Sequence, residues 1–366
     1  MGDVKEAVLQ VRNLSVAFGF DKNGMPRDGV NPLQVTDCVS FEIGVGDFFA
    51  LVGESGCGKS VTAMGVLRLL PQPSARIVEG SVLYSAGNGL APVDLAKLPL
   101  AGLQKVRGSE IACIFQEPMQ ALNPVVTIKK QLLEVFKFSC ADKGASSSRG
   151  HSRPDRGSSA EHIAEIRRML SLAGFNDPER VLNAYPHELS GGMLQRVCIV
   201  MALLSRPRLI IADEPTTALD VTVQAQVLAV LKDMAKSTGT AVLLITHNMG
   251  IVSQYADRVA VMYAGRIVET GEVRDVIDSP MHPYTQGLLA AIPENHSDMR
   301  TMKSIPGSVP HPKDFVQGCR FAERCEKCAN APADIRAKCL STEMPPRTFA
   351  ESSESHEASC FICTAN

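Results

Sequence analysis

Eight consecutive residues have the types and spacing that hold a polyphosphate. Gly53–Ser60 reads GESGCGKS and matches G-x-x-x-x-G-K-[ST] in full. Its three glycines let the backbone turn tightly, so that successive N–H groups point into one concavity. Lys59 can reach the β- and γ-phosphates as a point charge, and the Ser60 hydroxyl can ligate Mg²⁺. We expect a bound nucleoside triphosphate to contact Gly53, Glu54, Ser55, Gly56, Cys57, Gly58, Lys59, Ser60 and Val61.

The segments on either side supply the strand and the helix that such a loop needs. Phe48–Val52 (FFALV) is typical of a buried strand, and Val61–Leu70 (VTAMGVLRLL) predicts a helix. A strand, a loop and a helix in this order place the loop at a helix N-terminus, where the helix dipole favours an anion.

Two carboxylates and a histidine follow two further apolar runs. Asp213 and Glu214 come directly after Leu209–Ala212, and His247 comes directly after Ala241–Thr246. Continuous apolar runs are typical of buried parallel strands, whose carboxyl ends bind ligands in α/β folds. Asp213 is suited to hold Mg²⁺, and Glu214 is suited to polarise an attacking water. His247 can hydrogen-bond a γ-phosphate, with a polar cap to the strand as the alternative.

Two other segments hold candidate ligand contacts. Residues 189–196 read LSGGMLQR, in which Ser190 is a natural N-cap. Gly191 and Gly192 would let a ligand approach the start of the helix that follows. Phe18 can stack on an adenine, although a single Phe more often belongs to the core.

Length and charge restrict the class of protein. The 366 residues, of which 45% are hydrophobic, are enough for two or three domains with packed cores. A formal net charge of −2 gives no argument for a nucleic-acid partner. We find no apolar run near the ~18–20 residues of a membrane-spanning helix, and no signal region. We therefore expect a protein that stays in the cytoplasm unless membrane subunits hold it at the surface.

Other stretches predict local structure. Segment 139–160 is rich in Ser, Gly and Arg and nearly free of apolar residues, so we expect a disordered insertion there. Residues 8–18 suggest an edge strand, and residues 71–100 suggest turns and short strands. Ile163–Ala173 has helical spacing, and residues 259–270 read as a hairpin that closes the domain.

The cysteines are unevenly placed. Six of the eleven lie in the last 48 residues, which favours metal or redox chemistry in a cytosolic protein. Cys57 lies inside the phosphate loop, where Lys59 and the helix dipole would lower its pKa. This predicts that a thiol-modifying reagent blocks nucleotide binding.

Taken in order, these motifs resemble the nucleotide-binding subunit of an ABC transporter over residues ~8–275. By this resemblance the A-loop aromatic is Phe18, Walker A is Gly53–Ser60 and the Q-loop glutamine is Gln116. The signature is then Leu189–Met193, Walker B is Leu209–Glu214, the D-loop is Ala218–Asp220 and the switch histidine is His247. It implies ATP as the nucleotide, with Ser60, Gln116 and Asp213 around Mg²⁺. It also implies that Glu214 polarises the water and that Gln116 and His247 sense the γ-phosphate.

The family forms a head-to-tail dimer in which each ATP lies between one Walker A loop and the partner's signature, here Ser190–Gly192. Because the chain carries one set of motifs, the resemblance implies a second ATPase chain, with a heterodimer expected.

A closer resemblance is to the subunits of dipeptide, oligopeptide and nickel importers. It depends on Glu117–Pro124 (EPMQALNP), Tyr185–Gln195 (YPHELSGGMLQ), Pro280–Pro293, Ile305–Pro310 and Gly318–Cys325 (GCRFAERC). It implies two integral permease subunits, an extracytoplasmic solute-binding protein and a peripheral place on the cytoplasmic membrane face. It further implies that Gln116–Pro124 contacts a permease helix.

Members of this family resemble one another in four cysteines that can hold a [4Fe–4S] cluster, here Cys319, Cys325, Cys339 and Cys360. Two alternatives remain open. The CxxC pairs that begin at Cys325 and Cys360 can form a zinc site, or the cysteines are a reduced surface tail without metal.

The expected fold is α/β, a P-loop ABC ATPase core with a RecA-like mixed sheet and an antiparallel β subdomain. We expect this domain in residues 1–275, with a helical subdomain at about 117–205 and a cysteine-rich extension in residues 276–366. The function that we predict is ATP hydrolysis for import of peptides or related small solutes. A soluble ABC-type ATPase, a nickel importer and a metal- or redox-sensing module are the rivals.

Overall fold

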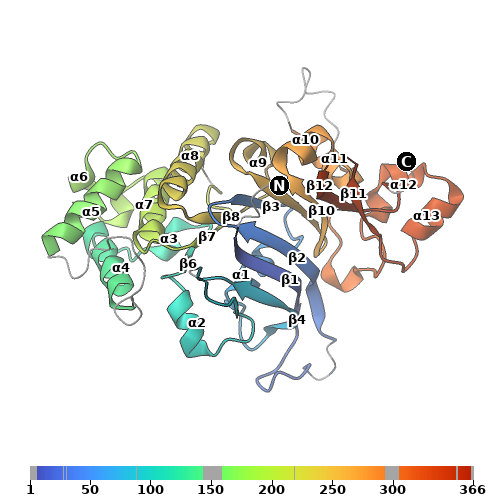
Figure 1. The fold of residues 1–366 in the computed structure, drawn as a ribbon, viewed down its shortest axis with the longest axis horizontal. Helices are drawn as coiled ribbons and strands as arrows, with labels where there is room; N and C mark the ends of the chain where they lie inside the picture. The colour runs from blue at the N-terminus through green and yellow to red at the C-terminus, as the bar shows by residue number, and fades with distance from the viewer. Residues whose placement is uncertain are drawn as a thin grey trace.

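The computed structural model describes residues 6–142, 159–292 and 305–363, apart from positions 28, 30, 88, 218 and 352. Its larger sheet consists of β3 (Phe48–Val52), β6 (Ile111–Ile114), β7 (Leu209–Asp213), β8 (Ala241–Thr246), β9 (Arg258–Tyr263), β10 (Arg266–Glu272), β11 (Arg347–Ala350) and β12 (Ser353–Ser359). The order is β11-β12-β10-β9-β3-β8-β7-β6 (Figure 1).

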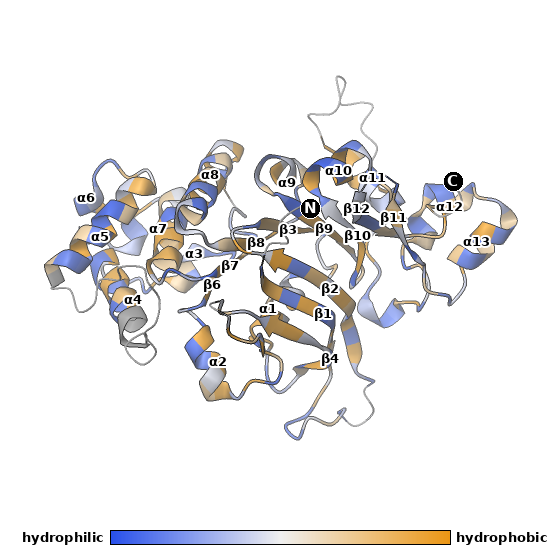
Figure 2. Cartoon of the chain, in the orientation of Figure 1, coloured by the Kyte–Doolittle hydropathy of each residue, from blue (hydrophilic) through white to orange (hydrophobic). Residues whose placement is uncertain are grey.

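The five strands from β9 to β6 in this sheet are parallel. Every residue of β3 and β8 is buried, as expected for apolar strands covered on both faces. Figure 2 shows apolar residues concentrated on these central strands, with polar residues on the outer helices. The predicted strands Phe48–Val52, 209–212 and Ala241–Thr246 are thereby confirmed.

A second, antiparallel sheet confirms the predicted β subdomain. It has the order β2-β1-β4-β5. Its strands are β1 (Ala7–Phe18), β2 (Leu33–Gly44), β4 (Ala75–Tyr84) and β5 (Val93–Asp94). The ten-residue β4 is longer than the short strands predicted for residues 71–100. Gly80, with φ 97°, and the register shifts between β1 and β4 interrupt the alternation that would have revealed it.

A group of helices lies beside the sheet edge at β6 and shares one apolar core with a face of the sheet. It contains α3 (Pro118–Ala121), α4 (Ile128–Asp142), α5 (Ser159–Leu172), α6 (Pro178–Asn183) and α7 (Gly191–Leu204). These helices pack against one another and against α8 (Val221–Thr238), at one end of the molecule (Figure 1). The segment predicted as a disordered insertion begins and ends within α4 and α5, and residues 143–158 lie outside the described part of the chain.

Helix α1 (Lys59–Val66) is shorter than the predicted helix Val61–Leu70 at its C-terminal end. Arg68, with φ 52°, has a left-handed backbone that ends the helical run. The remaining helices of the core are α2 (Leu100–Val106), α9 (Met249–Tyr255) and α10 (Val273–Asp278).

The C-terminal extension is built onto the larger sheet. It contributes α11 (Pro283–Ala290), α12 (Glu326–Ala329), α13 (Ala333–Cys339), β11 and β12. The predicted β9–β10 hairpin is confirmed, but it does not close the sheet, because β12 pairs with β10. A buried hydrogen bond of 2.7 Å between His356 of β12 and Glu269 of β10 fixes this attachment. Within the described residues, no helix has the length and apolar character needed to cross a membrane.

Candidate nucleotide site

The phosphate loop joins β3 to α1 and is shaped by its glycines. A Cβ atom at Gly53 would lie 2.1 Å from the backbone oxygen of Met262, so only glycine fits against β9 at this point. Gly56 and Gly58 have φ values of 82° and 109°, which L side chains rarely adopt. The loop and the start of α1 therefore have the conformation that the sequence predicted.

Lys59 is buried within this loop, with 4% of its surface exposed. Its ammonium donates to the carbonyl of Gly53 at 2.8 Å and to that of Glu54 at 3.0 Å. These contacts keep the positive charge at the loop, where it can meet phosphate oxygens.

A hydroxyl and a carboxylate meet beside the loop in the way that a Mg²⁺ site requires. Ser60 at the start of α1 donates to Asp213 Oδ1 at the end of β7, at 3.0 Å. Burial raises the pKa of Asp213, and the hydrogen bond from Ser60 opposes that shift. A hard divalent cation prefers such oxygen ligands and would stabilise the ionised carboxylate. The two residues fit Mg²⁺.

Glu214 is held in an unusual backbone conformation next to Asp213. Its φ is 45°, in the left-handed region, and its N–H donates to the Ile245 carbonyl of β8 at 3.0 Å. The carboxylate accepts a hydrogen bond from Thr217 at 3.1 Å and lies 3.4 Å from His247 Nδ1. Such strained positions are concentrated at functional sites. The structure thus brings Glu214 and His247 together and adds Thr217, which sequence reasoning missed because it has no motif of its own.

Gln116 lies at the same edge of the sheet as this carboxylate. It is exposed, two residues beyond the end of β6, and β6 pairs with β7. Among the hydrogen bonds of the described residues, none joins Gln116 to Ser60 or Asp213. Its predicted contacts with Mg²⁺ and the γ-phosphate stay predictions.

The predicted signature residues lie at the start of α7, in the helical part of the fold. Ser190 caps α7 by accepting the Met193 N–H at 3.4 Å, as predicted. A Cβ atom at Gly192 would lie 2.4 Å from Val223 of α8. Glycine at 192 is therefore required for the packing of α7 on α8, a role that the sequence did not indicate. Ser190 and Gly191 remain exposed.

Phe18 ends β1 and is half-buried against the core of the β subdomain. This agrees with the core alternative, and adenine stacking stays a prediction. Val61 lies in the first turn of α1 and packs against the same core. Of the D-loop Ala218–Asp220, Ala218 lies outside the described residues, and Asp220 caps α8 by accepting the Val223 N–H.

The prediction that Lys59 and the helix dipole lower the pKa of the Cys57 thiol is wrong. Its side chain is fully buried, and burial raises the pKa of its thiol although Lys59 acts in the opposite direction. The desolvation of a thiolate outweighs the nearby positive charge, so Cys57 is an inert core residue rather than an activated nucleophile.

The prediction of a metal site in the cysteine tail is not supported. All six cysteines are described, and the part of the chain that the structure covers contains no group of three or more metal-binding side chains. The sulfur atoms instead make local contacts: Cys325 accepts the Cys328 N–H, and Cys363 donates to the Met281 carbonyl. Neither the set Cys319, Cys325, Cys339 and Cys360 nor the paired CxxC motifs is arranged around a metal. The surface-tail alternative is also wrong, because four of the six cysteines are buried: Cys325, Cys328, Cys339 and Cys360.

Glu54 has a partner that the sequence did not reveal. Its carboxylate receives two hydrogen bonds from the Arg324 guanidinium, at 2.7 and 3.0 Å, and its N–H donates to the Tyr284 hydroxyl at 2.9 Å. Both partners belong to the C-terminal extension. The N–H and the carboxylate of Glu54 are therefore engaged within the chain, and the nucleotide contact predicted for this residue stays a prediction.

The fold and these residues define a P-loop ATPase of the ABC class. Residues 36–217 match the family model for ABC transporters, and residues 268–331 match the model for the oligopeptide/dipeptide transporter C-terminal region. The chain belongs to the ABC transporter ATP-binding proteins, in the oligopeptide and dipeptide branch. It is an ATP-hydrolysing transporter subunit.

Two relatives from Bacillus subtilis (strain 168) cover most of the chain. The oligopeptide transport ATP-binding protein AppD is 42% identical over 87% of this chain and 89% of its own length. The dipeptide transport ATP-binding protein DppD is 40% identical over 98% of this chain and 95% of its own length. Among solved structures, the post-hydrolysis dimer of the ATP-binding cassette MJ0796 bound to ADP and Pi has a TM-score of 0.56 and is 24% identical. That match covers 73% of this chain and 99% of the cassette, and it shows the shared fold.

Proposed function

We propose that this chain binds Mg²⁺-ATP at Gly53–Val61 and hydrolyses it to drive the import of di- or oligopeptides. The observation that carries the proposal is the convergence of Ser60, Asp213, Glu214 and His247 at the carboxyl edge of the sheet beside the phosphate loop. In this arrangement Ser60 and Asp213 hold the cation and the loop amides with Lys59 bind phosphates. The peptide solute is inferred from the relatives, which are named for oligopeptide and dipeptide transport.

Glu214 acts as the group that polarises the attacking water in this proposal. Thr217 and His247 hold its carboxylate, so the water is oriented when the γ-phosphate is in place. Closure against a second ATPase chain would bring that chain's equivalent of Ser190–Gly192 to the nucleotide. Because this chain carries one set of motifs, the proposal includes a second ATPase chain, with a heterodimer as the expected form.

The partners in the proposal are two permease subunits and an extracytoplasmic solute-binding protein. An exposed apolar strip supports a permease contact near the Q-loop: Phe115, Met119 and Val125 are 49%, 43% and 79% exposed. A helix of a membrane subunit would cover this strip. The chain would then be peripheral on the cytoplasmic membrane face.

Uptake of a radiolabelled tripeptide tests the function. Cells without the gene for this chain should lose uptake, and the wild-type gene should restore it. Lys59→Ala should not restore it, because the loop then lacks its ammonium. Lys97→Ala is the matched control, since that lysine side chain is 79% exposed and pairs with Asp94. Loss of nickel uptake with normal peptide uptake would contradict the peptide assignment. Cell fractionation tests the rival function. If all of the protein is found in the membrane-free fraction, without permease subunits, a soluble ATPase is favoured.

A further inference from the structure

The C-terminal extension reaches the phosphate loop at one residue, Glu54. Arg324 and Glu54 are 270 positions apart in sequence, yet the guanidinium and the carboxylate form a two-pronged pair. The Arg324 side chain is 8% exposed and that of Glu54 is 30% exposed. A pair of this geometry and burial is stronger than an exposed surface ion pair.

Arg324 is itself held in place from several sides. Its Nε donates to the Pro306 carbonyl at 2.7 Å, and Nη1 lies 3.3 Å from the Tyr263 hydroxyl. Its guanidinium also faces the rings of Tyr263 and Phe321, with centroid distances of 5.6 and 6.0 Å. Burial lowers the pKa of Arg324, but its bonds to Glu54 and Tyr263 raise it overall, so the group is a fixed cation.

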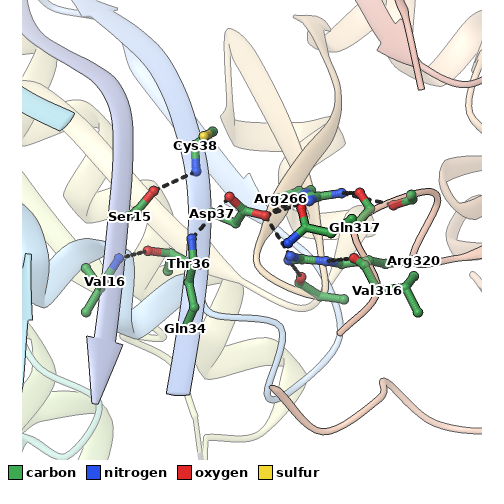
Figure 3. A network of polar contacts seen from close by, with 12 residues as sticks. Ser15, Val16, Gln34, Thr36, Asp37, Cys38, Arg266, Val316, Gln317 and Arg320 are labelled. Carbon is green, nitrogen blue, oxygen red and sulfur yellow. Dashed lines mark hydrogen bonds and ion pairs between the residues drawn. The ribbon is translucent and has the colours of Figure 1, made fainter. Parts of the chain in front are cut away.

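The segment that carries Arg324 is anchored a second time, four residues earlier. Arg320 pairs with Asp37 of β2 at 2.6 Å and donates to the Ala264 carbonyl at 2.6 Å (Figure 3). Arg266 binds the same Asp37 carboxylate and the carbonyl of Gln317. Together with the contacts of Arg324, they fix the GCRFAERC segment against the core before and within its short helical turn, Ala322–Arg324.

The turn between β9 and β10, which contains Ala264 and Gly265, contacts the phosphate loop directly. The N–H of Gly265 donates to the Cys57 carbonyl at 2.8 Å, and the Gly265 carbonyl accepts from the Asp37 N–H at 2.9 Å. Arg320 therefore stabilises this β9–β10 turn by its hydrogen bonds to Asp37 and to the Ala264 carbonyl, and that turn contacts the phosphate loop.

The charge of Glu54 gives this contact a consequence for nucleotide binding. Gly53–Val61 contains one carboxylate and one ammonium, so the loop alone has no net formal charge. Arg324 neutralises the carboxylate and draws it toward the extension. The loop then presents the charge of Lys59 to a polyanion without opposition.

We propose that Arg324 is a positioning residue for ATP, which withdraws and neutralises the Glu54 carboxylate so that the phosphate loop is cationic. The proposal depends on the assignment of Gly53–Val61 to the phosphates under the proposed function. In this proposal the C-terminal extension contributes to the nucleotide site, and Arg324, the second arginine of the GCRFAERC segment, has a role in ATP binding.

The test is a charge-suppressor experiment on the full-length chain, with a fluorescent ATP analogue titrated in the presence of Mg²⁺. Arg324→Gln should raise the Kd about tenfold, because an unpaired carboxylate then opposes the phosphates. Adding Glu54→Gln to Arg324→Gln should return the Kd to within about twofold of wild type, because the repelling charge is gone. In the assembled transporter, Arg324→Gln should raise KM for ATP and leave kcat unchanged.

Two controls separate this role from a structural one. Arg347→Gln breaks the exposed pair of Arg347 with Glu357 within the extension and should leave the Kd unchanged. Arg324→Lys keeps the charge without the two-pronged geometry and should give an intermediate Kd. A double variant that binds ATP as weakly as Arg324→Gln would overturn the proposal, as would an unchanged Kd in Arg324→Gln.

Lys59→Ala distinguishes failure of this inference from failure of the proposed site. If Lys59→Ala loses binding and Arg324→Gln does not, the inference is wrong and the site stands. If Lys59→Ala binds ATP normally, the site assignment itself is wrong, and the inference fails with it.

Discussion

Replacing Glu269 with methionine should release the C-terminal strands from the core. Glu269 lies on β10 with its side chain fully buried, and its carboxylate accepts from His356 of β12 at 2.7 Å. It also accepts the N–H groups of Met281 and His282, each at 2.8 Å. Methionine has a similar size and provides no comparable acceptor, so these donors would remain buried without partners.

The expected loss of stability can be estimated from the number of donors that lose their acceptor. Three donors lose the Glu269 carboxylate, and each unsatisfied buried donor costs about 1–3 kcal/mol. Because the terms overlap, we expect the opening free energy of β12 to fall by about 4 kcal/mol. This corresponds to roughly thousandfold faster amide exchange.

Hydrogen–deuterium exchange of peptides from β12 measures this directly. The control is Glu357→Gln, next to His356 in β12. It removes a partly exposed pair with Arg347 and should change exchange by less than about tenfold. Equal exchange in Glu269→Met and Glu357→Gln would refute the reasoning, because it would mean that the buried carboxylate does not hold β12 to β10.

Three further outcomes are expected. Burial lowers the pKa of His282 to about 4, so the unfolded chain, with a pKa near 6.5, takes up a proton first as the pH falls. Lowering the pH from 7.5 to 5 should therefore cost the wild type about 2 kcal/mol more than His282→Asn, as measured by urea unfolding. Gly192→Ala should destabilise the protein by about 1–3 kcal/mol through its clash with Val223, and adding Val223→Ala should restore most of the loss in thermal melting. Iodoacetamide should alkylate the buried Cys57 at least about a hundredfold more slowly than the exposed Cys38, as read by mass spectrometry of the peptides.

For each of these three predictions, one result would contradict it. An equal loss of stability at pH 5 in both forms would place the titrating group elsewhere than His282. A Gly192→Ala protein that Val223→Ala does not rescue would mean that the α7–α8 contact is not what requires glycine. Equal alkylation rates at Cys57 and Cys38 would show that the phosphate loop opens readily.

The parts that the sequence predicted well are those encoded by contiguous residues. The apolar runs of β3 and β8 predict buried parallel strands, and polar residues at their ends predict a site at one edge of the sheet. Ser60, Asp213, Glu214 and His247 come from three segments, and they meet because parallel strands end on the same edge.

The parts that the sequence could not predict depend on contacts between distant segments. The Arg324–Glu54 pair and the attachment of β12 to β10 have no local pattern, since each partner is an ordinary polar residue in its own neighbourhood. The pKa of Cys57 was predicted in the wrong direction because burial cannot be read from the motif. The cysteine spacing suggested a metal, whereas the described residues contain no group of three or more metal-binding side chains, and Cys325, Cys328 and Cys339 pack in an apolar cluster.

The central claim, that Glu214 activates the attacking water at this site, is tested most directly by one substitution. In the assembled transporter, Glu214→Gln should bind ATP with unchanged affinity and lose steady-state hydrolysis by about a hundredfold or more, because the amide cannot polarise water. The amide keeps the size of the carboxylate, so the contacts with Thr217 and His247 remain sterically permitted. Hydrolysis at the wild-type rate in Glu214→Gln would contradict the account.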